Sequence, residues 1–144
     1  MNNSEKAVEI FDSGLNCAQA VISLYAEKYR LDRELALRLT CGFGAGMARM
    51  QETCGAVTGA MMIIGLAVAD MKPDYADRKE EVYAIIHDFI KHFKERNNFI
   101  KCSELLNCDV NTEEGKYFYD VNELHDKVCL KCVKDAVDIL DILI

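Results

Sequence analysis

The sequence predicts an all-α protein, a compact helical bundle of five to six helices. Apolar residues recur at spacings of three and four over most of the chain, which is the period of an amphipathic helix. No segment shows the apolar–polar alternation of a strand or an Asn-Gly hairpin turn. One proline and eight glycines are too few for a disordered or collagen-like segment. With 144 residues, the chain is expected to form one domain over residues 1–144.

Capping residues mark the first three predicted helices. Ser4, Asn16 and Asp32 each precede an apolar-periodic segment, and side chains of these types accept hydrogen bonds from the free N–H groups of a helix start. Gln19 follows Asn16 by three positions, which is the spacing of a capping box. The three predicted helices cover residues 4–11, 17–30 and 32–41.

The middle of the chain predicts a turn followed by a buried helix. Glycines at alternate positions over residues 42–46 break the third helix and predict the turn. Thr53 then caps an almost wholly apolar helix over residues 54–70, shorter than the ~18–20 residues that span a bilayer. Gly55 and Gly59 lie four apart on it, so a second helix can approach that face closely.

The second half of the chain predicts two further helices. Asp74 follows the single proline and begins the most amphipathic helix, over residues 74–97. Residues 102–108 predict an irregular connection with one turn. The final helix begins near Asn122 and continues to the C-terminus. Its apolar ending, residues 139–144, suits homodimerisation or docking, and a plain core helix explains it as well.

Composition limits the functions that this chain can have. Its net charge is −7, with 17 Lys and Arg and no concentrated basic face, which argues against a nucleic-acid partner. The N-terminus has no apolar signal-peptide region and no segment long enough to span a membrane, so a cytoplasmic location is expected. Seven cysteines in a reducing compartment do not form a stable disulfide framework. The thiols therefore need a chemical explanation.

Cys17 and Cys54 occupy matched positions. Each follows a predicted capping residue, Asn16 or Thr53, and so lies in the first turn of a helix. Free N–H groups and the helix dipole favour an anion there, which predicts a lowered thiol pKa and a reactive thiolate. The alternative is that each cysteine is a small apolar residue in a tight bundle.

Cys129 and Cys132 form a C-x-x-C pair on one face of the last predicted helix. This spacing suits a redox dithiol or two thiolate ligands of one metal, although Cys132 is also explained as a core residue. His125 precedes Cys129 by one turn and is a candidate ligand or base, or merely a surface histidine.

The three remaining cysteines lie near predicted turns. Cys102 and Cys108 flank a polar connection with free N–H groups, and Cys41 precedes the glycine-rich turn. No strand precedes that turn, so it is not a dinucleotide-binding fingerprint. Its glycines instead let the backbone pass close to the helix that begins at Cys54.

Together these segments resemble a known family. They are Asn16-Cys17-Ala18-Gln19-Ala20, the glycines between Gly42 and Met47, Cys54-Gly55-Ala56-Val57-Thr58-Gly59, Cys102 before Leu105-Leu106, and Cys129. Over nearly the whole chain they resemble the C_GCAxxG_C_C family of redox-active proteins, of which the CGAxxG element at residues 54–59 is the most specific part. The resemblance implies four functional cysteines, Cys17, Cys54, Cys102 and Cys129. Cys41, Cys108 and Cys132 lie outside that set and, with His125, are accessory candidates.

Three functions remain open on this evidence. In the first, the four cysteines converge on one centre that holds a metal, with an iron–sulfur cluster favoured over zinc, and the protein transfers electrons between partners that the sequence does not identify. In the second, a cofactor-free pair of cysteines exchanges thiols and disulfides, as in an oxidoreductase. In the third, the protein is a non-enzymatic metal-binding partner of a transporter, because genes of the family often lie near transporter genes.

The first two functions require that the four thiols surround one pocket. If all four bind one metal ion directly, their sulfurs are expected to lie about 4 Å apart. Cys54 is expected to be the most reactive thiol, because several N–H donors converge on it.

Overall fold

The computed structural model describes residues 1–144 and contains eight α-helices. A 3₁₀ turn over Cys41–Phe43 follows α3, and a π-helical turn over His125–Cys129 precedes α8. Extended pairing is limited to one isolated antiparallel bridge between Thr53 and Lys101. The predicted all-α class is therefore confirmed. The helices are α1 Asn3–Asp12, α2 Cys17–Ala26, α3 Arg33–Thr40, α4 Gly55–Met71, α5 Tyr75–Asn97, α6 Cys102–Leu106, α7 Glu113–Val121 and α8 Leu130–Leu143.

The predicted number of five to six helices is wrong, because α6 and α7 were not predicted as helices. Helix α6 has five residues, too few to show a period. Helix α7 is capped by Thr112, which accepts from the N–H of Gly115 at 2.9 Å. Its Tyr117 and Val121 are exposed, so it has little of the apolar stripe that predicts a helix. The last helix accordingly begins at Leu130 and not near Asn122.

Two of the predicted caps are confirmed, and a residue predicted to begin a helix is a cap as well. The Asn16 side chain accepts from the N–H of Gln19 at 2.8 Å, and the Gln19 side chain accepts from the N–H of Asn16 at 3.0 Å. Asp32 accepts from the N–H of Leu35 at 2.8 Å. Asp74 accepts from a backbone N–H in the first turn of α5. These local hydrogen bonds position the starts of α2, α3 and α5.

Two predicted caps are wrong. Helix α1 is capped by Asn2, which forms a capping box with Glu5, whereas Ser4 lies inside the helix. Helix α4 is capped by Cys54 itself, whose side chain makes no capping hydrogen bond, and Thr53 is taken up by the bridge to Lys101. Cys54 therefore stands at the junction between an extended segment and a helix.

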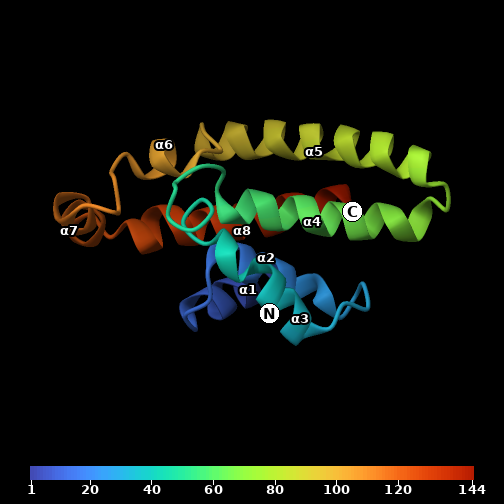
Figure 1. The fold of residues 1–144 in the computed structure, drawn as a ribbon, viewed down its shortest axis with the longest axis horizontal. Helices are drawn as coiled ribbons and strands as arrows, with labels where there is room; N and C mark the ends of the chain where they lie inside the picture. The colour runs from blue at the N-terminus through green and yellow to red at the C-terminus, as the bar shows by residue number, and fades with distance from the viewer.

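The three longest helices, α4, α5 and α8, run side by side along the molecule, and α1 to α3 pack on one side of them (Figure 1). Helices α6 and α7 lie at the end where α4 begins. Buried side chains at the centre include Ile63 of α4, Phe89 and Phe93 of α5 and Leu140 of α8. In the C-terminal segment Ile139 and Leu140 are buried and Ile142 is exposed, so most of that apolar ending is part of the core.

Close approach of α2 to α4 brings two cysteines together. A Cβ atom added at Gly55 would lie 2.9 Å from the Ala18 nitrogen and 3.1 Å from the Cys17 Cβ. One added at Gly59 would lie 3.1 Å from the Ala18 oxygen. The predicted close contact on this glycine face is confirmed, and it places the start of α2 against the start of α4.

Helix α4 is the most apolar element of the fold, but it lies within the bundle with nine of its residues buried. None of the helices has both the length and the apolar character needed to cross a bilayer.

Candidate functional site

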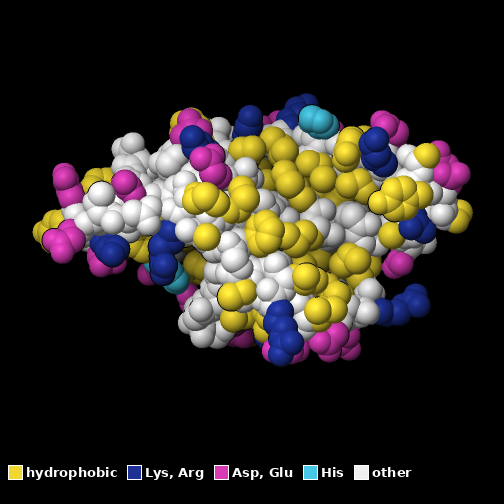
Figure 2. All heavy atoms as spheres, viewed as in Figure 1, with side chains coloured by type: hydrophobic (Ala, Val, Ile, Leu, Met, Phe, Trp, Pro, Cys, Tyr) yellow, Lys and Arg dark blue, Asp and Glu magenta, His cyan; other side chains and the backbone are white.

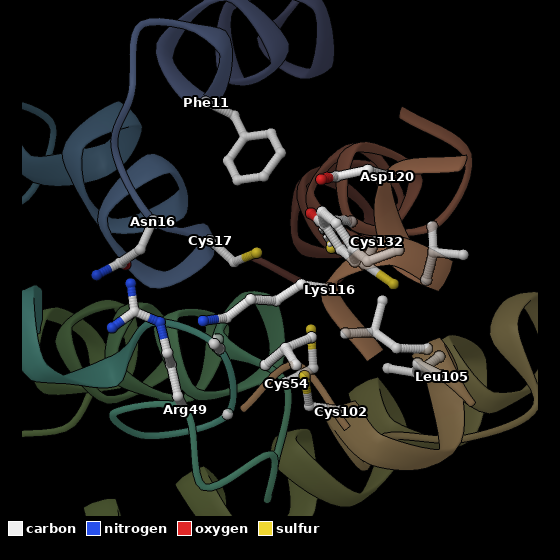
Figure 3. A pocket seen from close by; sticks show the side chains of 18 residues that line it. Phe11, Asn16, Cys17, Arg49, Cys54, Cys102, Leu105, Lys116, Asp120 and Cys132 are labelled. Atoms are coloured by element: carbon white, nitrogen blue, oxygen red, sulfur yellow. Dashed lines mark hydrogen bonds between the residues drawn. The ribbon is translucent and has the colours of Figure 1, made fainter. Parts of the chain in front are cut away.

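A cavity of about 420 Å³ lies at the end of the bundle where α2, α4, α6 and α8 begin, and five of the seven cysteines line it (Figure 3). The five are Cys17, Cys54, Cys102, Cys129 and Cys132. Cys41 is exposed and does not line the cavity. Cys108 is half-buried and lines a separate, more open hollow beside Gln51.

The four cysteines that the resemblance implies come from four separate segments. Cys17 is the first residue of α2 and Cys102 the first of α6, while Cys54 is the capping residue of α4. Cys129 ends the π-helical turn and leads into α8. Three of the four thiols thus lie at helix N-termini, where free N–H groups favour an anionic sulfur.

The isolated bridge between Thr53 and Lys101 brings Cys54 and Cys102 into one wall of the cavity. The N–H of Cys54 donates to the Ile100 oxygen at 2.8 Å, and the N–H of Cys102 donates to the Glu52 oxygen at 2.6 Å. Two cysteines nearly fifty positions apart are therefore held by a pair of backbone hydrogen bonds. No periodic pattern in the sequence indicates this pairing.

The loop before that bridge has a left-handed backbone. Residues 45–49 all have φ between +50° and +66°, and each non-glycine residue in that region costs roughly 1–2 kcal/mol. At Gly46 a Cβ atom would lie 2.8 Å from the Cys102 Cβ and 2.6 Å from the Glu52 nitrogen. Glycine is therefore required there, both for its conformation and because the loop packs directly on Cys102.

Hydrogen bonds from the segment after α6 hold the left-handed loop in place. The buried Gln51 side chain donates to the Cys108 oxygen at 2.8 Å and accepts from the N–H of Val110 at 2.9 Å. The Asn111 side chain donates to the Arg49 oxygen at 2.8 Å. These contacts offset the cost of the backbone conformation and position the Arg49 side chain at the cavity.

Among the thiols of the site, Cys54 has the most strongly lowered pKa. Hydrogen bonds from the thiols of Cys132 and Cys17 lower its pKa well below the ordinary value, and the N–H groups of Ala56 and Val57 lower it further. Burial acts in the opposite direction, because a buried thiolate loses its hydration. The hydrogen bonds outweigh this cost, as the sequence predicts for a cysteine at a helix start.

Cys17 behaves differently from Cys54 although both lie at helix N-termini. Its thiol interacts with the thiols of Cys129 and Cys54, and these interactions together with burial raise its pKa well above the ordinary value. The predicted low pKa of Cys17 is therefore wrong. When one proton has left the pair of contacting thiols, the remaining proton can reside on either sulfur. The nearby N–H groups at the start of α4 favour the negative charge on Cys54, so the proton stays on Cys17.

The acidities of the other cavity cysteines follow from the same contacts. The Cys17 thiol, with the Tyr119 hydroxyl at 3.6 Å, lowers the pKa of Cys129. The pKa of Cys132 is raised, because its thiol donates to Cys54 and is buried. Burial raises the pKa of Cys102 to about 12. Lowered and raised thiol pKa values thus alternate from Cys129 through Cys17 and Cys54 to Cys132.

His125 lies outside the cavity. Its ring stacks on Phe11, with centroids 4.6 Å apart, and its Nδ1 is 3.0 Å from a carboxylate oxygen of Asp126. Its proximity contributes to the lowered pKa of Cys129, but its ring is not among the groups that surround the thiols. Of the accessory candidates, the structure brings only Cys132 into the cavity.

The arrangement of sulfur atoms limits which metal group the site fits. Asp12, His125 and Asp126 are the group of three metal-ligating side chains whose donor atoms all lie within 4.8 Å of one another. No three of the thiols do so. A site for one ion with all sulfurs about 4 Å apart is therefore not preformed.

Comparison with known families identifies the chain. Residues 15–143 match the family described as "Putative redox-active protein (C_GCAxxG_C_C)". The chain belongs to this family. The matched residues include all five cysteines of the cavity. No curated protein and no solved structure gives a match.

Sequence reasoning missed two cationic residues and a tyrosine of this site. Arg49 lines the cavity from the left-handed loop, and Lys116 and Tyr119 line it from α7. The spacing of Lys116, Tyr119 and Asp120 places them on one face of a helix. This spacing could have predicted α7. Arg49 had no such signal, because the loop that positions it is shaped by contacts distant in sequence.

Proposed function

We propose that this member of the C_GCAxxG_C_C family is an electron-transfer protein in which Cys17, Cys54, Cys102 and Cys129 hold an iron–sulfur cluster. One observation carries the proposal: thiols from four separate segments line the same cavity, three of them at helix N-termini. Cysteine thiolates are the usual ligands of such clusters. When bound, the cluster would supply one-electron chemistry.

The cavity's own residues support this choice over a zinc ion. A zinc ion needs its four ligand atoms close together in a tetrahedron around it. No three of these sulfurs lie within 4.8 Å of one another. The Cys132 thiol and the nearby N–H groups of Ala56 and Val57 favour negative charge on the Cys54 sulfur. Hydrogen bonds to ligand sulfurs raise the reduction potential of a cluster. These groups would therefore tune the centre as well as orient it.

Anaerobic purification with iron and sulfide analysis and a visible spectrum tests the proposal. We expect a brown protein that contains iron and acid-labile sulfide, and we expect Cys54→Ser to lose both. Cys41→Ser is the matched control, because Cys41 is exposed and outside the cavity. A colourless protein that takes up no iron after anaerobic reconstitution would exclude the cluster.

A second candidate is cofactor-free thiol–disulfide exchange, which the contact between Cys54 and Cys17 favours. Their opposite pKa shifts provide a thiolate that attacks and a thiol that resolves. The Cys54 thiolate would attack a substrate disulfide and form a mixed disulfide, releasing one substrate thiolate, which takes up a proton. Cys17, on losing its proton, would attack the Cys54 sulfur and release the second substrate thiol. The substrate is then reduced, and Cys17 and Cys54 are joined in a disulfide.

Trapping separates the two candidates. If exchange is the function, Cys17→Ser accumulates a mixed disulfide at Cys54 that mass spectrometry detects, and the unsubstituted protein loses two free thiols per turnover. If the cluster is the function, the protein carries iron and no mixed disulfide forms. In either case we propose that the protein works in the cytoplasm with a separate electron donor or acceptor.

A further inference from the structure

Two cationic side chains line the thiol cavity without an anionic partner. Arg49 comes from the left-handed loop and Lys116 from α7. Both residues are exposed, and the ion pairs of the protein include neither. In a chain with net charge −7, two unpaired cations beside one cavity form a local positive site.

Both cations are directed at the same part of the cavity. Figure 3 shows the Lys116 ammonium and the Arg49 guanidinium pointing toward one another beside Asn16, while Asp120 lies on the opposite side. The Asn16 side chain is already used, because it donates to the Thr40 and Cys41 oxygens and accepts from the N–H of Gln19. Like charges that converge repel each other, so an anion between them stabilises the arrangement.

The remaining walls are mostly apolar. Apart from the cysteines and Tyr119, six apolar residues line the cavity: Phe11, Ala45, Leu105, Leu106, Val110 and Val128. The volume of about 420 Å³ lies within the ~300–1,000 Å³ that is usual for small-molecule sites. A ligand of this site therefore combines an apolar body with a negative group.

We propose that the cavity binds a small anionic molecule with an apolar body, and that its negative group lies between Arg49 and Lys116 while its other end faces the thiols. This rests on the proposed redox function of the site and names the class of molecule that would exchange electrons there. The left-handed loop fits the same role, since backbone strain is retained where it positions a functional side chain.

Charged and neutral alkylating reagents of nearly equal size test the inference. Cys54 is only 6 % exposed, so iodoacetate and iodoacetamide reach it through the cavity. Mass spectrometry of the reduced, metal-free protein gives the rate of each reagent at each cysteine. We expect the iodoacetate-to-iodoacetamide ratio at Cys54 to exceed the ratio at exposed Cys41 by about tenfold.

Charge variants show whether the two cations cause this preference. Lys116→Gln and Arg49→Gln should each lower the iodoacetate rate at Cys54 severalfold and leave the iodoacetamide rate unchanged. Lys116→Glu should lower the iodoacetate rate further. Lys79→Gln is the matched control, since it removes the same charge near the start of α5, at the other end of the molecule.

An equal ratio at Cys54 and Cys41, unchanged by the Lys116 and Arg49 variants, would overturn the inference. Failure of Cys54 to react with either reagent would also overturn it, because the cavity would then admit no small molecule. Neither result bears on iron content or the visible spectrum, so the proposed cluster stands or falls separately.

Discussion

Neighbouring thiols in the cavity differ in acidity because each can donate to only one partner at a time. The thiols of Cys132 and Cys17 and the two N–H groups at the start of α4 lower the pKa of Cys54. Cys17 instead keeps its proton, because its contacts with Cys129 and Cys54 and its burial raise its pKa. A single thiolate supported by several donors is a stronger nucleophile at neutral pH, and a better ligand, than a row of equivalent thiols.

The first prediction concerns the pKa of Cys54. In the reduced, metal-free protein, the iodoacetamide rate at Cys54 should rise with pH about a midpoint well below the ~8.5 of an ordinary thiol. The rate at Cys108 should have a midpoint above it, because burial and the charge of Asp109 raise the pKa of that thiol. Rates at each cysteine are measured by mass spectrometry. A shared midpoint near the ordinary value would contradict an activated Cys54.

The second prediction tests which donor matters most. Cys132→Ala removes the largest of the effects that lower the pKa of Cys54, so the alkylation midpoint of Cys54 should move upward. Cys132 is 1 % exposed, and its loss should also lower the free energy of unfolding by about 1 kcal/mol. Cys41→Ala, outside the cavity, is the control for both measurements. An unmoved Cys54 midpoint would show that Cys132 only fills space.

At the scale of elements, the features that depend on residues close in sequence could be predicted, and those that depend on tertiary contacts could not. The cap at Asn16 and the apolar face of α5 depend on residues three or four positions apart, so the sequence shows them. The left-handed run over residues 45–49 depends on Gln51 bonding across to Cys108 and Val110. No local pattern predicts a backbone that is stabilised by residues nearly sixty positions away.

The third prediction concerns the helix contact that places Cys17 beside Cys54. Gly55→Ala puts a methyl group 2.9 Å from the Ala18 nitrogen, where only backbone can move, and should lower the free energy of unfolding by about 1–3 kcal/mol. Gly65→Ala, on the same helix, meets nothing within 4 Å and should raise it by about 0.5–1 kcal/mol. Urea unfolding measures both variants. Equal shifts in one direction would contradict the packing explanation.

At the scale of the whole molecule, the site exists only once the bundle has folded. Cys17 and Cys129 are more than one hundred positions apart and are in contact in the cavity. The family resemblance indicated four cysteines that line the cavity, because the motif is linear. It could not indicate that Cys132, Arg49 and Lys116 join them, since their places depend on the π-helical turn, the left-handed loop and α7.

The last prediction follows from the raised pKa values of Cys17, Cys102 and Cys132. Above the ordinary thiol pKa of ~8.5, the unfolded chain has released these protons, whereas the folded protein keeps them. The unfolded state then binds fewer protons, so the free energy of unfolding falls as pH rises from that value toward the folded pKa, about 12 for Cys102. The lowered pKa values of Cys54 and Cys129 act at lower pH, where their contribution is lost as pH falls.

Urea unfolding of the reduced, metal-free protein at about pH 8 and about pH 9.5 measures this loss below the titration of most tyrosines and lysines. We expect lower stability at the higher pH. Cys102→Ser removes one of the groups responsible and should make the loss smaller, while Cys41→Ser, with its exposed thiol, should leave it unchanged. Equal or greater stability at the higher pH would mean that the cavity thiols are hydrated in the folded protein, and the burial that keeps their protons in place would have to be abandoned.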